Sequence, residues 1–198
     1  MPPKETGLEV RILVTQKDEL EQLLRQLFTD QLLAVLGTQS QSGPYGSLVA
    51  FYATDDLKHL LFATTRSTRK YDNLTRIPQV AMVIDNRSNK EGDFHEAIAV
   101  TAIGTVKEVG GPEKEQYKSL YLEKHPGLFD FVQSPTCALL KIEVGTYYIV
   151  RQFQQVTELH ITHDCSTPDR SPSKSGLNPG GTQNFHALAF DGLGPQYF

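Results

Sequence analysis

The sequence predicts a mainly β protein, a six- to seven-stranded antiparallel β-barrel with flanking helices. Short apolar runs follow one another with brief polar turns between them, which favours antiparallel hairpins over parallel crossovers. A glycine, Gly104, interrupts the longest of these runs and indicates the bulge or bend that a curling sheet requires. A sheet of this size normally closes on itself, because closure removes its unpaired edges.

Composition limits the class of protein further. The chain has 198 residues, of which 39% are hydrophobic and 21% charged, as expected for one soluble globular domain. Its formal net charge of −4 argues against non-specific binding to nucleic acid. No run is apolar for long enough to cross a bilayer, and the first residues carry no apolar signal segment. We therefore expect a cytoplasmic protein that binds neither nucleic acid nor membrane.

The two cysteines do not form a disulfide framework. We expect reduced thiols, with Cys137 as a small core residue because it lies in an apolar run. Cys165 belongs to a segment of different composition.

Three segments are predicted along the chain: an N-terminal lead-in (1–14), a barrel domain (15–160) and an irregular tail (161–198). The tail is rich in Ser, Pro and Gly and has little periodicity. It also carries enough apolar residues to dock on the domain or on a partner subunit: Phe185, Leu188, Phe190, Tyr197 and Phe198.

The elements of the domain follow from periodicity and turn residues. A helix is expected from Thr15, because apolar residues between Leu20 and Phe28 recur on one helical face. A short helix should precede Pro78, and another should begin at Pro112 and stop at 126–127. The predicted strands span residues 32–38, 46–53, 58–65, 80–85, 97–109, 136–144 and 147–156.

A basic corner, residues 64–70, joins the third predicted strand to the short helix. Arg66, Arg69 and Lys70 lie here in an otherwise acidic chain, together with four hydroxyl side chains. A helix N-terminus offers free N–H groups and a partial positive charge, so this corner predicts a phosphate site. The alternative is a solvated helix start with ordinary capping. Arg66 is expected either to point to solvent or to reach a substrate, and Asn73 to bond a neighbouring strand or loop.

The order of these elements resembles a known family. The amphipathic helix, the basic corner and the strand segments at 32–38, 43–51, 59–64 and 78–84 resemble the FMN-binding split-barrel family, also called pyridoxamine 5′-phosphate oxidase-like. The resemblance covers roughly residues 15–157. It implies a split barrel that binds FMN and forms a homodimer, with a flavin at the subunit interface.

The resemblance also implies which residues contact the cofactor. The corner Thr68-Arg69-Lys70 matches the one that grips the FMN phosphate, and Thr64 is expected to face the phosphate or ribityl chain. The second strand would lie along the flavin ring, largely through its backbone. The implied cofactor-binding residues are Ser47, Leu48, Val49, Ala50, Thr64, Ser67, Thr68, Arg69 and Lys70.

Departures from the family pattern weaken the case for pyridoxine chemistry. Pyridoxamine phosphate oxidases have an arginine where this chain has Ser47, and a late Trp, whereas this chain contains no Trp. We expect an FMN-dependent oxidoreductase of unknown substrate, and we assign no catalytic residue. The alternatives are a flavin redox carrier or sensor without turnover, a haem-handling member of the superfamily, and a member that binds the deazaflavin F420.

No metal site is predicted. His160, His163, Asp164 and Cys165 lie close together in sequence, but their spacing matches no familiar zinc pattern.

Overall fold

The computed structural model describes residues 7–152 and 155–163, with side chains from Gln16 onward. The predicted docking of the tail, and Cys165 with it, lie outside the described residues. Seven strands form one antiparallel sheet in the order β3-β2-β1-β4-β5-β6-β7, and a further pairing of β3 with β6 closes six of them into a barrel. The fold class predicted from the sequence is confirmed. The strands are β1 (Leu33–Ser40), β2 (Gly43–Ala53), β3 (His59–Thr65), β4 (Gln79–Asp85), β5 (Ile98–Glu108), β6 (Cys137–Arg151) and β7 (Gln155–His160).

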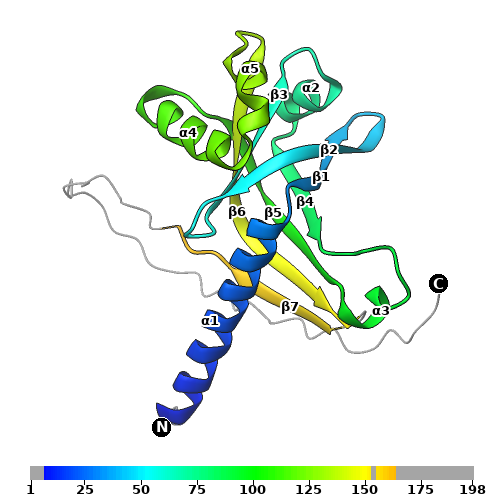
Figure 1. Cartoon of the computed structure of the whole chain (residues 1–198), viewed down its shortest axis with the longest axis vertical. Coiled ribbons are helices and arrows are strands. Elements are labelled where there is room, and N and C mark those ends of the chain that lie inside the picture. The colour runs from blue at the N-terminus through cyan, green and yellow to red at the C-terminus, as the bar shows by residue number, and fades with distance from the viewer. Residues whose placement is uncertain (1–6, 153–154, 164–198) are drawn as a thin grey trace, which may run out of the picture. The chain divides into compact units, whose positions relative to one another are not determined.

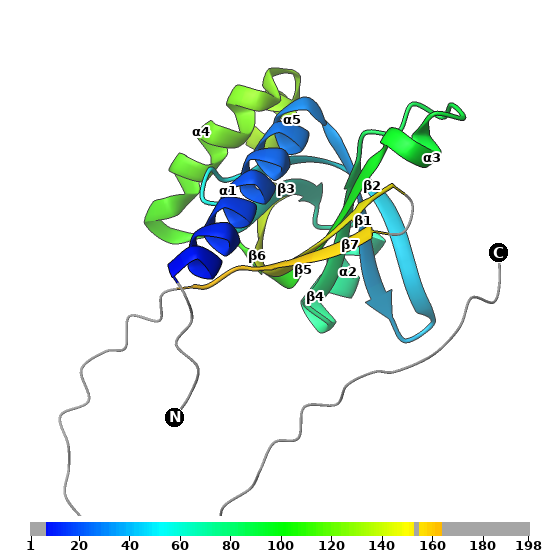
Figure 2. The same ribbon diagram turned by 90° about the horizontal axis from the view of Figure 1, so that it is seen from below.

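Helices cover parts of the barrel wall (Figures 1 and 2). The long helix α1 lies against β2 and β4, α4 lies against β2 and β3, and α2 lies beside β1. The helices are α1 (Gly7–Asp30), α2 (Arg69–Arg76), α3 (Asp93–Glu96), α4 (Lys114–Lys124) and α5 (Phe129–Gln133), with 3-10 turns at Gly111–Glu113 and Pro126–Leu128.

Two apolar clusters stabilise this arrangement. The barrel interior is filled from every strand and from the apolar face of α1, and it includes Leu24, Phe51 and Phe62. A second cluster lies on the outer face of β3 and β6, where Leu61 and Leu139 pack against Tyr121 of α4. Helix α4 therefore covers a wall of the barrel whose other side faces the core.

Gly104 has the role predicted for it. The register between β5 and β6 shifts between Ile103 and Gly104, opposite Gly145, which is the extra residue of the bulge. A Cβ at Gly104 would overlap the backbone carbonyl of Glu143 on β6, so only glycine allows the two strands to approach here.

Two predictions of element bounds are wrong. Helix α1 begins at Gly7, not at Thr15, because residues 8–14 contain no glycine or proline that would stop it. The strands predicted at 136–144 and 147–156 are one strand, β6, up to Arg151. The chain passes Gly145 without turning, since β5 pairs with β6 on both sides of it. The short helices α3 and α5 were not predicted.

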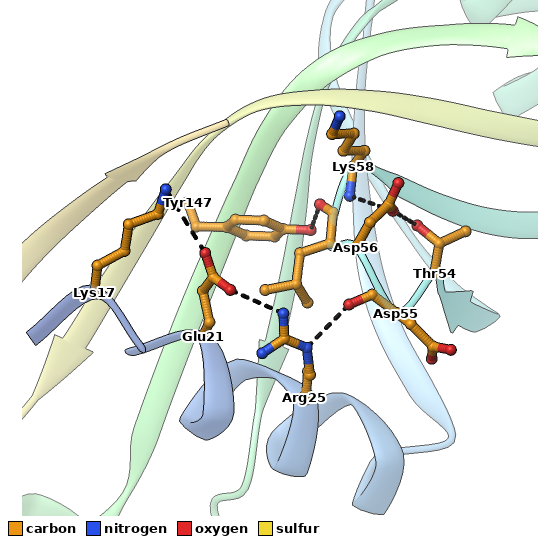
Figure 3. A network of polar contacts seen from close by, with 9 residues as sticks. Lys17, Glu21, Arg25, Thr54, Asp55, Asp56, Lys58 and Tyr147 are labelled. Atoms are coloured by element: carbon orange, nitrogen blue, oxygen red, sulfur yellow. Dashed lines mark hydrogen bonds and ion pairs between the residues drawn. The ribbon is translucent and has the colours of Figure 1, made fainter. Parts of the chain in front are cut away.

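The turn between β2 and β3 is tied to the rest of the barrel (Figure 3). Arg25 of α1 donates to the carbonyl of Asp55 at 2.9 Å and pairs with Glu21 at 2.8 Å. From the barrel interior, the hydroxyl of Tyr147 donates to the carbonyl of Leu57 at 2.8 Å. We call residues 54–59 the turn end of the β2–β3 pair.

Candidate functional site

Strands β2 and β3 pair over only three residues, although each is much longer. The pairs are Phe51 with Phe62, Tyr52 with Leu61, and Ala53 with Leu60. Beyond them β2 continues along β1 and β3 continues along β6, so the two strands separate. We call the unpaired stretches, residues 46–50 of β2 and 63–65 of β3, the β2–β3 split.

Backbone alternation determines which groups face the split. The N–H of Phe51 donates to the carbonyl of Leu32, on the β1 side of the strand. Neighbouring residues in a strand point their backbone groups to opposite edges, so Gly46, Leu48 and Ala50 point theirs toward β3. Strand β2 therefore presents to the split an edge of N–H and C=O groups that do not pair with β3, of which the Ala50 carbonyl accepts from the Tyr121 hydroxyl.

The basic corner follows directly from β3, and Thr68 caps helix α2 there. The side chain of Thr68 accepts from the N–H of Tyr71 at 3.4 Å and donates to the carbonyl of Thr65 at 2.8 Å. Because its proton is used, the neighbouring Thr64 hydroxyl, 3.1 Å away, is the donor between the two side chains. Both threonine hydroxyls thus hold the corner in shape, and Thr64 is buried.

Other donors at the corner remain available. The N–H groups of Arg69 and Lys70 belong to the first turn of α2. N–H groups in the first turn of a helix have no acceptor within that helix. Within the described part of the chain, no hydrogen bond or ion pair engages the Lys70 ammonium or the exposed Ser67 hydroxyl. These groups provide a positive, hydrogen-bonding surface at a helix N-terminus, which suits a phosphate.

Arg69 links the corner to the β1–β2 hairpin. Its guanidinium donates to the hydroxyl of Ser42 at 3.0 Å and lies 4.8 Å from the centre of the Tyr45 ring. Both contacts are exposed and replaceable by an anion. Sequence reasoning missed Ser42 and Tyr45, since no local pattern places a hairpin 24 or more residues away beside this arginine.

Arg66 is bound by other parts of the chain. Its guanidinium donates to the carbonyls of Pro135 and Cys137, at 3.0 and 2.8 Å, and forms an ion pair with Glu108. Glu108 also accepts from the Tyr71 hydroxyl at 2.8 Å, and this hydrogen bond raises the pKa of Tyr71. Arg66 therefore anchors the corner to β5 and β6.

Asn73 behaves as predicted. Its amide donates to the Thr38 hydroxyl on β1 at 2.9 Å, and both side chains are buried. This bond joins α2 to the barrel from inside.

The predicted residues of β2 fall on two faces. Ser47 and Val49 point inward, where the buried Ser47 hydroxyl has no hydrogen-bond partner among the described residues. Leu48 and Ala50 point outward, and Leu48 is 63% exposed. Of the four, only Leu48 and Ala50 turn their backbone groups toward the split. Ser47 and Val49 pair with β1 and point their side chains into the barrel.

An apolar surface lies outside the barrel next to the split. Leu33 and Val35 of β1 are exposed, and they pair with Ala50 and Leu48 of β2. Ile103 of β5 is exposed as well. Large apolar groups gathered on one sheet face are typical of a surface that another molecule covers.

The histidines considered as metal ligands make local contacts. His160 lies 3.1 Å from the Thr146 hydroxyl, and His163 lies 2.7 Å from the carbonyl of Val144. Across residues 7–152 and 155–163, no group of three or more His, Cys, Asp and Glu side chains is placed to hold a metal ion. No helix in these ranges has the length and apolar character needed to cross a bilayer.

Comparison with known proteins places this site in context. The family model of pyridoxamine 5′-phosphate oxidase matches residues 20–151, about two thirds of the chain. That range contains both sides of the split and the whole basic corner. No curated protein matches the chain in sequence.

Solved structures share the fold at low sequence identity. General stress protein 26 from Bacillus anthracis str. Sterne superposes with a TM-score of 0.55 at 18% identity, covering 72% of this chain and 98% of that one. An FAD-binding protein from Mesorhizobium loti gives 0.51 at 17% identity, with 64% and 88% covered. A haem-binding protein from Mycobacterium smegmatis gives 0.59 at 14% identity, with 66% of this chain and 53% of that one covered. At these identities the likeness is one of fold.

Proposed function

The chain belongs to the pyridoxamine 5′-phosphate oxidase family, and we propose that it binds FMN at the β2–β3 split as an oxidoreductase of the cytoplasm. The observation that supports the proposal is that the basic corner, which follows β3, lies beside the β2–β3 split, where the edge of β2 does not pair with β3. A phosphate and an extended ring system need these two features side by side.

The corner is proposed to hold the phosphate. Lys70 supplies a positive charge with no competing partner in the described chain, and the first-turn N–H groups of α2 supply directed donors. Arg69 would exchange its contact with Ser42 for the phosphate, and Ser67 would add a hydroxyl. Thr64 and Thr68 would act indirectly, because their hydroxyls fix the start of α2 and so the direction of its N–H groups.

The ring is proposed to lie along β2. The backbone groups of Leu48 and the N–H of Ala50 face the split, where they would offer donors and an acceptor to the edge of an isoalloxazine ring. The unpartnered Ser47 hydroxyl lies on the same segment. A bound flavin supplies hydride or single-electron transfer, chemistry that side chains cannot provide, while the chain binds and orients it.

We further propose a homodimer that covers the apolar surface beside the split. Leu33, Val35 and Leu48 are between 37% and 63% exposed, and a second subunit would remove them from water. Light scattering on the purified protein should then give twice the chain mass of 22.1 kDa.

The phosphate assignment is tested by titrating cofactor-free protein with FMN and with riboflavin, which lacks the phosphate. FMN should bind at least about 100-fold more tightly, because two or more charge-assisted hydrogen bonds contribute ~1.5–3 kcal/mol each. The variant Arg69→Ala with Lys70→Ala should remove most of this difference. Arg76→Ala is the matched control, since Arg76 lies on the same helix and pairs with Asp72.

Equal affinity for FMN and riboflavin would overturn the phosphate assignment. A protein that ignores both and takes up haem or F420 would assign the site to one of those cofactors. Reduction of the bound flavin that depends on an added substrate separates an enzyme from a redox carrier.

A further inference from the structure

The point at which β2 and β3 stop pairing is occupied by one side chain of α4. The last hydrogen-bonded pair before the split is Tyr52 with Leu61, and two residues further on Ala50 and Ala63 would form the next. That pair is missing. The hydroxyl of Tyr121 instead donates to the carbonyl of Ala50 at 3.3 Å, and the backbone N–H of Ala63 is directed at the hydroxyl oxygen of Tyr121.

We propose that Tyr121 is a wedge, inserted into the ladder between β2 and β3, that ends their pairing and holds the split open. A direct bond between strands joins the two backbones through one N–H···O contact of about 2.9 Å. With a hydroxyl between them the backbones are joined by two hydrogen bonds in series, so they must stand further apart. Beyond Tyr121, β2 continues along β1 and β3 continues along β6, so the two strands diverge.

The wedge is held firmly. Tyr121 is 1% exposed and packs against Leu61, Val109 and Leu139 in the second apolar cluster. The ring of His125 lies 4.9 Å from its ring, and the Nε2 of His125 is 2.8 Å from the carbonyl of Phe51. Because a carbonyl only accepts, the His125 Nε2 carries the proton.

The end of α4 is fixed to a second part of the barrel as well. The Lys124 ammonium donates to the carbonyls of Phe28 and Gln31, at 2.5 and 2.8 Å, and lies 4.3 Å from the centre of the Phe51 ring. Three residues at the end of α4, Tyr121, Lys124 and the following His125, thus contact β2 and the junction of α1 with β1. The position of the Tyr121 hydroxyl is therefore set by the packing of α4 against β2, β3 and the α1–β1 junction, and not by its hydrogen bond to Ala50 alone.

Without the hydroxyl, the partly buried carbonyl of Ala50 and the N–H of Ala63 would lose their partner. An unsatisfied buried backbone group is unfavourable, so the strands gain by pairing directly. Strand β2 would then close toward β3 and narrow the split. As a consequence that rests on the proposed function, Tyr121 acts as a positioning residue for the flavin ring.

The test uses NMR on the full-length protein without cofactor, so that the wedge is judged apart from flavin binding. In the wild type, the Tyr121 hydroxyl proton should be protected from exchange and close to the Ala63 amide proton. The α-protons of Val49 and Thr64, which face each other closely in a continuous antiparallel ladder, should show no contact. A contact between these α-protons in the wild type would overturn the wedge without any variant.

Tyr121→Phe removes only the hydroxyl, and Tyr117→Phe, one turn earlier on α4, is its control. We expect the Val49–Thr64 contact to appear in Tyr121→Phe alone, and FMN affinity to fall about 10-fold in that variant alone. If Tyr121→Phe changes neither the strand contact nor FMN binding, the inference is wrong. If the contact appears but the wild type binds no flavin, the wedge stands and the proposed function fails.

Discussion

The two ends of the β2–β3 pair differ in what holds the strands. At the turn end, the N–H of Thr54 donates to the carbonyl of His59 at 2.9 Å, and the Tyr147 hydroxyl donates to Leu57. At the split, the Tyr121 hydroxyl stands between the strands where a backbone bond would be. The same strand pair is thus held by hydrogen bonds at its turn end and is unpaired at the split. The split is the end that lies beside the basic corner.

The comparison predicts that stability depends mainly on the turn end and cofactor affinity on the split. Tyr147→Phe should show the largest stability effect. Its hydroxyl is fully buried, and its loss leaves the carbonyl of Leu57 without a partner. We expect ~1–3 kcal/mol less free energy of unfolding, measured by urea denaturation, with FMN affinity unchanged. A loss of FMN affinity at full stability would mean that the two ends are not separate.

Thr68→Ala should affect both properties moderately. It removes the cap of α2, which is expected to cost ~0.5–2 kcal/mol of stability and to loosen the N–H groups that face the phosphate. Thr68→Ser keeps the capping oxygen and serves as the control. If Thr68→Ala weakens neither stability nor FMN binding, the cap does not organise the corner.

Arg25→Ala should have a small effect, although it breaks one contact with the turn end and one with Glu21 of α1. Arg25 is exposed, and exposed ion pairs contribute little, so we expect less than ~1 kcal/mol by the same denaturation assay. Arg25→Lys keeps the charge and tests whether the bond to the Asp55 carbonyl matters. A loss as large as that of Tyr147→Phe would contradict the order proposed here.

The smallest effect should be a pH dependence from His125 beside the wedge. Burial lowers the pKa of His125 below its ordinary value of about 6.5. As the pH falls below that value, the unfolded chain binds the proton first, so the free energy of unfolding should decline. His125→Gln retains a donor near the Phe51 carbonyl and should flatten this part of the pH profile. An unchanged slope would show that His125 does not titrate on unfolding.

Local sequence signals were sufficient for most of the fold and for the corner. The first five strands, the bulge beside Gly104 and the short helix after the basic corner each follow from residues next to one another in sequence. Gly145 was misleading, since it resembles a strand end but lies inside β6. Its effect depends on β5, which pairs with β6 across it and keeps the strand continuous.

Distant contacts account for what could not be predicted. Arg66 looked available because its acceptors, near Glu108 and residues 135–137, lie more than 40 residues further along. Tyr121 lies 71 residues after Ala50 and is an ordinary apolar position in the pattern of α4. The β2–β3 split exists because two strands stop pairing. Its extent can therefore be found only from the positions of β2, β3 and α4 together.

The measurement that tests the central claim most directly is the visible absorption spectrum of the purified protein, followed by mass analysis of the molecule that heating releases. We predict the two absorption bands of an oxidised flavin and the mass of FMN. A colourless protein that also fails to bind added FMN would contradict the account, because the basic corner and the unpaired edge of β2 would then have no flavin to hold.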